Sequence, residues 1–487
     1  MAAAAPRTSL LPSSIALLLL ALALSALVPS SDAYDSLDPT GNITIKWDVR
    51  QWTDDGYVAT VSLYNHQQYR HIQAPGWKLG WVWAEKEMIW KMTGAQTTEQ
   101  GDCSRFKAEA HCCRTDPEVV DLLPGAPYNK QTSNCCKGGV LSSWGQDPAN
   151  AIATFEVRVG QAGTSRSSIK APTNFTLMAP GPGYTCGPAK KVERTKFIDG
   201  DARRTIQALE TWNVTCTYSQ FVAGRTPTCC VELSSFYNST IVECNTCSCG
   251  CQDNSTSPVS CVKANSPYLA SVVNGDSTNI PVPLVQCTSH MCPIRVHWHV
   301  KANYKEYWRV KITATNLNYR MNYSQWNLVA QHPNFANLTT IFSFKYKDLN
   351  PYGIISEGFA SIIFHLKTSI LGNVYLFVLQ LLTSYYSVGA DDTGMMWGIK
   401  YYNDLLMTAD RNGNVQSELL FRKDPETFTF QKGWAFPRRV YFNGENCVMP
   451  PPDVYPWLPN ASHQLSASLT IPFITVWTAL AFLLVHV

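Results

Sequence analysis

The sequence predicts a mainly β protein with two antiparallel β-sandwich-like domains joined by a disulfide-rich cysteine segment. Short stretches alternate apolar and polar residues with the period of half-buried strands. One pair of these stretches recurs at a constant offset of 251 positions without a gap. Between the two copies lies a run dense in cysteine, and a secretory leader places that run in an oxidising compartment. Together these observations favour two related domains of a secreted protein.

The N-terminus predicts a secretory signal peptide over residues 1–33. Arg7 precedes an apolar run, residues 15–28, that is too short to cross a bilayer. Ser31-Asp32-Ala33 then supplies small residues where a signal peptidase cuts. We prefer this interpretation to a signal anchor, and cleavage would leave Tyr34 at the mature end.

The first sandwich is expected over residues 34–180. Residues 44–49 and 57–63 alternate like strands, and Thr53-Asp54-Asp55-Gly56 has the composition of the turn between them. Gly- and Pro-containing stretches at 163–172 and 179–190 predict a linker that closes this unit.

The second sandwich is expected over residues 265–447, because residues 294–316 repeat the first pattern. In this alignment Trp47 matches Trp298, Val49 matches Val300, Tyr57 matches Trp308, Val61 matches Ile312 and Asn65 matches Asn316. Identity is low, so chance similarity is the alternative to a true internal repeat.

Aromatic content is high, with 15 Trp and 22 Tyr, and aromatic faces stack on the apolar faces of sugar rings. Trp77, Trp81 and Trp83 have the same parity, so an unbroken strand would place them on one face. We predict that they bind carbohydrate, with Tyr57 as a further candidate. The alternative is that these rings point into the core of the sandwich.

The cysteine segment, residues 181–264, could bind a metal, carry out redox chemistry or form disulfides. Cys244 and Cys247 have zinc-ligand spacing, but thiols in an oxidising compartment pair with one another. We therefore predict disulfides, no metal and no cofactor. The candidates are Cys229, Cys230, Cys244, Cys247, Cys249 and Cys251. Because the chain has 17 cysteines, one should stay free or pair with another chain.

The C-terminus predicts a glycolipid (GPI) anchor. A proline-rich stalk over residues 448–460 ends in the small triplet Asn460-Ala461-Ser462, followed by a polar spacer and an apolar tail. Lys or Arg would normally follow a membrane span, but no basic residue follows this tail. We expect Asn460 to carry the anchor, residues 461–487 to be removed, and the protein to lie on the extracellular face of the plasma membrane.

Glycosylation sequons agree with secretion. They occur at Asn42, Asn174, Asn213, Asn238, Asn254, Asn322, Asn337 and Asn460. The net charge of +3, without a basic run, argues against a nucleic-acid partner.

No catalytic constellation is recognisable, and we predict no catalytic residue. Glu85 with Glu87 and Asp391 with Asp392 are available as paired carboxylates, but neighbours in sequence need not flank a substrate. His297 and His299 could ligate a metal, yet no third ligand follows at a recognisable spacing, so surface histidines are the better interpretation.

Several motifs resemble those of the plant COBRA and COBRA-like family across nearly all of the mature chain. They include QYRHIQAPGW, PYNKQTSNCCKGG, PGPGYTCGPA, TWNVTCTYSQF, HMCPIRVHWHVK and GWAFPRRVYFNG. The family's double-cysteine motif usually has Ser after Val231, where this chain has Glu232. The resemblance implies a GPI-anchored extracellular protein with a cellulose-binding-like N-terminal module. It also implies a role in cellulose microfibril deposition, oriented cell expansion and wall strength.

One departure from the family pattern is large. The pattern runs almost directly from Tyr352-Gly353 to Asp392-Thr393-Gly394, whereas this chain carries an apolar insert at residues 354–390. Residues 370–388 could nearly span a bilayer. We interpret the insert as a retained intron or a gene-model error, ahead of a partner-facing loop or a real span.

Three functions of different classes follow. The first is a noncatalytic binder of cellulose or a related wall polysaccharide, held at the plasma membrane. The second is a cell-surface module that docks a wall-protein partner through its cysteine segment. The third is a glycan-modifying enzyme, for which the sequence offers the least support.

Overall fold

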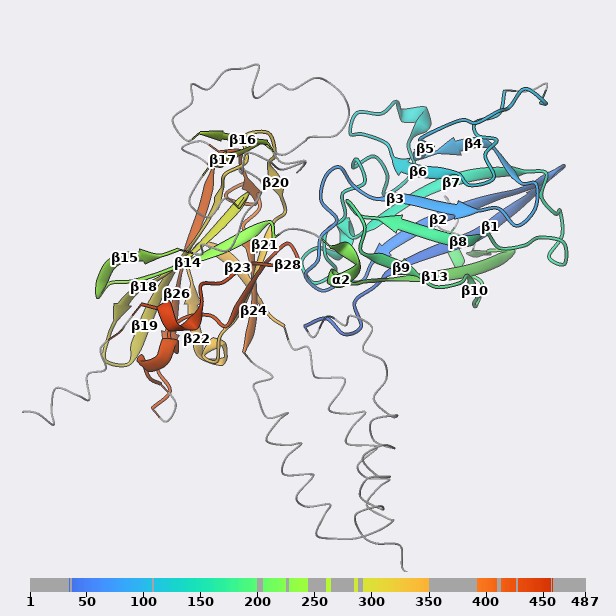
Figure 1. Cartoon of the computed structure of the whole chain (residues 1–487). Coiled ribbons are helices and arrows are strands. Elements are labelled where there is room, and N and C mark those ends of the chain that lie inside the picture. The colour runs from blue at the N-terminus through green and yellow to red at the C-terminus, as the bar shows by residue number, and fades with distance from the viewer. Residues whose placement is uncertain are drawn as a thin grey trace, which may run out of the picture.

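A computed structural model shows a chain whose regular secondary structure is mainly β-strand, which confirms the mainly β class. Two domains of packed, mainly antiparallel sheets lie side by side (Figure 1). The described residues are 35, 37–106, 109–198, 205–224, 227–243, 260–263, 284–287, 292–349, 392–409, 413–425, 428–456 and 458.

The first domain packs two sheets around one core. The larger sheet has the order β10-β13-β1-β2-β7-β4, with β9 also paired to β13, and the smaller has the order β5-β6-β3-β8. The strands of the larger sheet are β1 (Ile43–Thr53), β2 (Gly56–Asn65), β4 (Met88–Thr93), β7 (Ile152–Gly160), β9 (Tyr184–Cys186), β10 (Lys190–Lys191) and β13 (Glu210–Tyr218). Those of the smaller are β3 (Lys78–Val82), β5 (Ala95–Thr97), β6 (Glu118–Asp121) and β8 (Thr173–Met178). A ribbon, β11 (Lys196–Ile198) with β12 (Thr205–Gln207), and three short helices complete it: η1 (Tyr128–Lys130), η2 (Pro148–Asn150) and α2 (Gln220–Ala223).

The second domain repeats this plan with the sheets β15-β14-β18-β19-β26-β22 and β23-β24-β21-β27-β28. The first contains β14 (Cys229–Ser235), β15 (Asn238–Val242), β18 (Ile294–Asn303), β19 (Tyr307–Asn316), β22 (Leu338–Ile341) and β26 (Asn414–Arg422). The second contains β21 (Asn327–Gln331), β23 (Phe344–Asp348), β24 (Thr393–Gly398), β27 (Arg439–Phe442) and β28 (Glu445–Asn446). Two ribbons pair β16 (Ser260–Lys263) with β17 (Leu284–Cys287) and β20 (Tyr323–Ser324) with β25 (Leu405–Leu406); the short helices are η3 (Phe335–Asn337), η4 (Gln431–Gly433) and η5 (Pro452–Val454).

Pairing registers confirm the internal repeat. Trp47 pairs with Val61 across the β1–β2 hairpin, and Trp298 pairs with Ile312 across the β18–β19 hairpin, again 251 positions on. Both hairpins carry a β-bulge at the equivalent place, between Val49 and Gln51 in the first and between Val300 and Ala302 in the second. A bulge changes twist and register locally, so a shared position is a sensitive marker of common architecture.

The repeat covers whole sheets. The orders β13-β1-β2-β7-β4 and β5-β6-β3-β8 correspond to β14-β18-β19-β26-β22 and β23-β24-β21-β27. Asn65 and Asn316 also have the same role at the ends of their strands. Each buried amide donates to the carbonyl five residues on, of Arg70 and Met321 respectively, at 2.9 and 2.7 Å. The larger sheets of the two domains differ in one pairing: β13 lies antiparallel to β1, whereas β14 lies parallel to β18.

The structure corrects the expected domain boundaries. The first sandwich does not end near residue 180, because β9 and β13 return to its larger sheet. β14 already belongs to the second domain. Residues 181–264 are therefore divided between the two sandwiches wherever the structure describes them. The predicted linker also has a structural role, because β9 and the start of β10 lie within its second stretch, residues 179–190, and pair with β13 of the first domain.

The described part of the predicted stalk packs on the second domain. Val448 pairs with Cys230 of β14, and Leu458 is buried in the second core. Tyr455 contacts Phe436 with ring centroids 5.7 Å apart. Residues 448–456 and 458 therefore extend the domain instead of forming a free stalk, because their apolar side chains find a partner surface.

The predicted insert, residues 354–390, lies outside the described residues, and β23 and β24 are the strands on either side of it. β23 and β24 pair directly, and the Leu349 amide donates to the Thr393 carbonyl at 3.0 Å. The insert therefore enters and leaves at one hairpin connection. Among the described residues, no helix has the length and apolarity needed to cross a bilayer.

Deleting residues 354–390 is expected to stabilise the second domain by about 1–2 kcal/mol. A shorter connection lowers the entropy lost when β23 and β24 meet. Urea denaturation of the full chain and the deletion variant measures the difference. A deletion variant that is less stable would mean that the insert packs against the domain.

Candidate functional site

The residues predicted to bind carbohydrate lie in the core of the first domain. Trp77, Trp81, Trp83 and Tyr57 are only 2%, 2%, 5% and 1% exposed. Trp81 and Trp83 meet the edge of Trp47 at centroid distances of 5.2 and 6.0 Å. Because these rings fill the space between the two sheets, none offers a face to a sugar. The predicted row of exposed indoles is therefore wrong.

The histidine pair forms a local hydrogen-bonded unit with a serine. Ser234 Oγ lies 2.7 Å from both His297 Nε2 and His299 Nδ1. Burial, followed by the neighbouring positive charges, lowers the pKa of both rings, that of His297 to about 4. Both rings are therefore neutral near pH 7, and one hydroxyl bridges them. Within the described segments, no three His, Cys, Asp or Glu side chains gather as a metal site would require.

The candidate carboxylates have structural roles. Glu85 pairs with Lys170 at 2.7 Å, and Glu87 accepts a hydrogen bond from the Glu85 amide at 2.6 Å. Asp392 pairs with Arg438 at 3.3 Å. Asp391 lies outside the described residues.

Cysteines pair across the fold, as predicted for an oxidising compartment. Cys229 is bonded to Cys447, which joins the first strand of the second domain to its last segment. Cys230 is buried beside Cys292 and Val448. Cys244, Cys247, Cys249 and Cys251 lie outside the described residues. The other described disulfides are Cys103–Cys113, Cys135–Cys136 and Cys186–Cys216.

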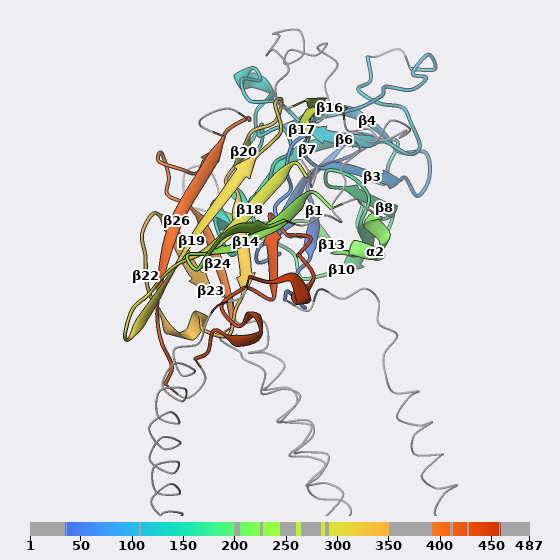
Figure 2. The same cartoon turned by 60° about the vertical axis from the view of Figure 1, so that its left-hand side comes forward.

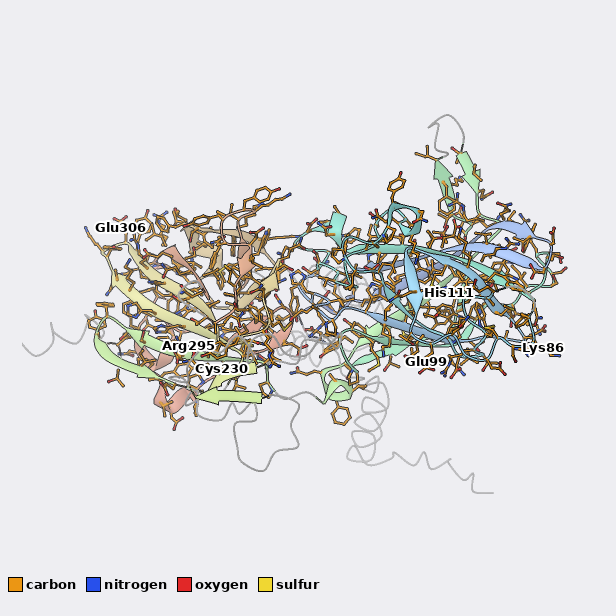
Figure 3. All side chains as sticks on the ribbon, turned by 90° about the horizontal axis from the view of Figure 1, so that it is seen from above. Lys86, Glu99, His111, Cys230, Arg295 and Glu306 are labelled. Carbon is orange, nitrogen blue, oxygen red and sulfur yellow. A yellow bond between two sulfur atoms is a disulfide. The ribbon has the colours of Figure 1, made fainter. Side chains whose placement is uncertain are left out.

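Cys112 is a free cysteine of the described part of the chain. Its thiol donates to the carbonyl of Glu99, labelled in Figure 3, at 3.3 Å. Burial raises the pKa of this thiol. The thiol is therefore protonated and shielded near neutral pH.

The sequons differ in accessibility. Asn174 and Asn322 are exposed, whereas Asn42, Asn213 and Asn337 are half-buried. Asn238 begins β15, and Asn254 and Asn460 lie outside the described residues. Glycosylation of all these sites stays a prediction.

A buried ion pair joins the two domains. Arg70, from the QYRHIQAPGW motif, contacts Glu445 of β28 at 2.9 Å, and its guanidinium lies over the Tyr218 ring at 3.7 Å. The Tyr218 hydroxyl donates to Glu445 at 3.2 Å. Burial opposes the charge on Arg70, but Glu445 and nearby tyrosines hold its pKa above the ordinary value. Gly444 permits this approach, because a Cβ there would meet the Arg70 Cα at 2.8 Å.

An amide network extends the same junction. The side-chain amide of Asn327 in β21 donates to the Tyr69 carbonyl at 2.9 Å and to Gln146 Oε1 at 3.0 Å. Gln146 in turn donates to the Gln325 carbonyl at 3.0 Å. Lys347 adds a bond to the Gly145 carbonyl at 3.2 Å. These buried, directional contacts hold the domains as one unit.

His71 makes this junction sensitive to acid. Its Nδ1 accepts from the Ser143 amide at 2.8 Å, so Nε2 carries the proton and donates to Gln146 at 2.9 Å. Burial lowers the pKa of His71 to about 4 from 6.5. Below pH 6.5 the unfolded chain binds a proton that the native state excludes, so stability falls as the pH drops towards 4.

Between pH 7 and pH 5 the free energy of unfolding of the His71→Gln variant is expected to fall by about 2 kcal/mol less than that of the native chain. Urea denaturation of both proteins at the two pH values measures this difference. Equal pH dependence would contradict the assignment, whatever the variant's stability at pH 7.

The most exposed tyrosines lie on loops that strand periodicity does not describe. Tyr128, Tyr401 and Tyr402 are 92%, 90% and 74% exposed. Tyr128 follows β6, whereas Tyr401 and Tyr402 follow β24. Sequence patterns do not reveal these residues, because one or two tyrosines in a turn have no periodic signal. They are the described tyrosines best placed to stack on an external ring.

Comparison with known proteins identifies relatives over almost the whole chain. A COBRA N-terminal domain model matches residues 57–219, and a COBRA family C-terminal domain model matches residues 228–369 and 355–456. COBRA-like protein 1 of Oryza sativa subsp. japonica is 68% identical over 478 residues, which cover 98% of this chain and 99% of that protein. Protein COBRA of Arabidopsis thaliana is 61% identical over 456 residues, which cover 93% and 92% respectively.

Proposed function

The chain belongs to the COBRA family, and from that premise we propose that it is a noncatalytic binder of cellulose or a related wall polysaccharide. The observation that carries this proposal is the exposure of Tyr128, Tyr401 and Tyr402 on loops of two β-sandwiches. A tyrosine offers an apolar face to a sugar ring and a hydroxyl to its polar edge. Such contacts bind a glycan without performing chemistry on it.

The proposed setting is the extracellular face of the plasma membrane, next to the cell wall. The signal peptide and the small triplet at Asn460 followed by an apolar tail support a GPI anchor. Confinement at a surface raises the effective concentration of a weak binder near its polymer. In this role the protein would assist cellulose microfibril deposition, oriented cell expansion and wall strength.

A sedimentation assay tests the binding proposal. The secreted chain without the terminal tail is mixed with microcrystalline cellulose, swollen amorphous cellulose or insoluble xylan, and the protein left in solution is measured. We expect saturable depletion by at least one polymer and no release of soluble sugar. A folded protein that binds none of them would contradict the proposal and favour a protein partner.

Release from cells tests the anchor separately. We expect a phosphatidylinositol-specific phospholipase to free the protein from intact plant cells. Protein that resists the enzyme but is extracted by detergent would contradict a GPI anchor.

A further inference from the structure

The internal repeat places the exposed tyrosines in equivalent loops of the two domains. β6 ends at Asp121, which pairs with Ala95, and β24 ends at Gly398, which pairs with Phe344. Since β5-β6 corresponds to β23-β24, the loops that begin at residues 122 and 399 leave their sheets at the same place. Tyr128 lies on the first loop, and the second carries two tyrosines.

The first loop is held rigidly from below. The buried Asp121 carboxylate accepts hydrogen bonds from the amides of Cys136, Lys137 and Gly139, each at 2.9 Å. The Gly94 amide donates to the Lys130 carbonyl at 2.7 Å, next to Tyr128. The Tyr128 ring is therefore presented from an ordered base, which lowers the entropy lost on binding.

The second loop is held by one asparagine. Asn403 Oδ1 accepts from the Ile399 amide at 2.6 Å, and its Nδ2 donates to the Ser343 carbonyl at 2.7 Å. The Asn403 carbonyl accepts from the Trp326 indole at 2.8 Å. These bonds fix the turn that carries Tyr401 and Tyr402.

Tyr401 also adopts a backbone conformation that is unusual for an aromatic residue. Its φ is +66°, in the left-handed region where glycine or asparagine is preferred. The side chain is almost fully exposed, so burial does not offset this strain. Strain at such a position is typical of a residue held for contact with another molecule.

Both loops lie on the same side of the molecule. β6 is near the upper edge of the first domain in Figures 1 and 2, and β20 is near the upper edge of the second. β20 pairs with β25, which directly follows the second loop. The ion pair and the amide network at the junction fix the relative position of the two domains. The relative position of the two loops is therefore fixed as well.

We propose that the two loops form one bipartite binding surface for a neutral β-linked polysaccharide, with one tyrosine contact from each domain. This inference rests on the proposed function and specifies its binding surface. A long polymer can engage both loops at once, whereas a small solute cannot. Residues 122–139 contain no carboxylate; beside Lys130 and Lys137 they expose uncharged amide and hydroxyl groups near Tyr128 in the sequence, which suits sugar hydroxyls. These groups belong to Asn129, Gln131, Ser133 and Asn134.

The test compares loop variants of the full secreted chain. Tyr128→Ala removes the first contact, and a double variant, Tyr401→Ala with Tyr402→Ala, removes the second. Phe221→Ala is the matched control, because Phe221 is 89% exposed but lies on α2, outside both loops. Affinity for microcrystalline and amorphous cellulose is measured by sedimentation, and near-ultraviolet circular dichroism checks folding.

Loss of either loop is expected to weaken binding at least tenfold, because joined contacts on a rigid body reinforce one another. Phe221→Ala should bind like the native chain. If the native chain binds and each loop variant loses twofold or less, the bipartite surface is overturned while the proposed function stands. If the folded native chain does not bind, the proposed function fails and this inference with it.

Discussion

Replacing Arg70 with methionine is expected to lower the free energy of unfolding by about 3–5 kcal/mol. The substitution leaves Glu445 and the Tyr218 hydroxyl at the junction without the guanidinium that neutralises the carboxylate. A buried charge without its partner is costly, and methionine keeps the apolar volume of the arginine stem. We also expect the domains to move relative to one another, because the ion pair links β28 to the first domain.

Urea denaturation measures the stability change, and small-angle scattering measures the separation of the domains. Lys78→Met is the matched control, because it removes a solvent-exposed ion pair in which Lys78 Nζ lies 3.4 Å from Glu118. This variant should lose less than about 1 kcal/mol of unfolding free energy. Adding Glu445→Gln to Arg70→Met should recover part of the loss, because it removes the unpaired charge. Equal small effects of Arg70→Met and Lys78→Met would contradict the role assigned to this junction.

The repeat was predictable because alternation is a local property. Trp47 and Trp298 lie in stretches whose inward residues recur at every second position, and hairpin partners are near in sequence. The pairing of each with its hairpin partner followed from the turn between the strands. Nothing beyond a short window was needed.

Which face of a strand is buried in the core was not predictable from the local pattern. The shared parity of Trp77, Trp81 and Trp83 indicates a common environment but does not say whether that face meets the core or the solvent. The second sheet decides it, because β3 packs over the β1–β2 hairpin and brings Trp81 to Trp47. That contact joins segments whose meeting no local pattern describes.

The domain boundaries and the junction between the domains could not be predicted from the sequence for a related reason. β13 pairs with β1, although a long Gly- and Pro-containing stretch that is typical of a linker precedes it in the sequence. Arg70 and Glu445 are hundreds of residues apart, and a charged residue in a loop is normally expected at the surface. Such features depend on how complete domains dock.

Removing the Cys229–Cys447 disulfide, with both residues changed to alanine, is expected to lower the stability of the second domain by about 5 kcal/mol. The bond spans 218 residues, and the unfolded chain gains entropy when so long a loop is opened. It also ties β14 to the last segment of the domain, where the Val448 amide donates to the Cys229 carbonyl at 3.0 Å. The Val231 amide donates back to the Val448 carbonyl at 2.9 Å, so the bond and the backbone pairing support the same edge.

The short disulfide in the first domain provides the comparison. Cys103 and Cys113 are 10 residues apart, and their replacement by alanine should cost about 3 kcal/mol on the same loop-entropy reasoning. Urea denaturation followed by tryptophan fluorescence gives the stability of each variant under oxidising conditions. If opening the long loop costs no more than opening the short one, β14 is held by its pairing with β18 and Val448, and the disulfide is secondary to those hydrogen bonds.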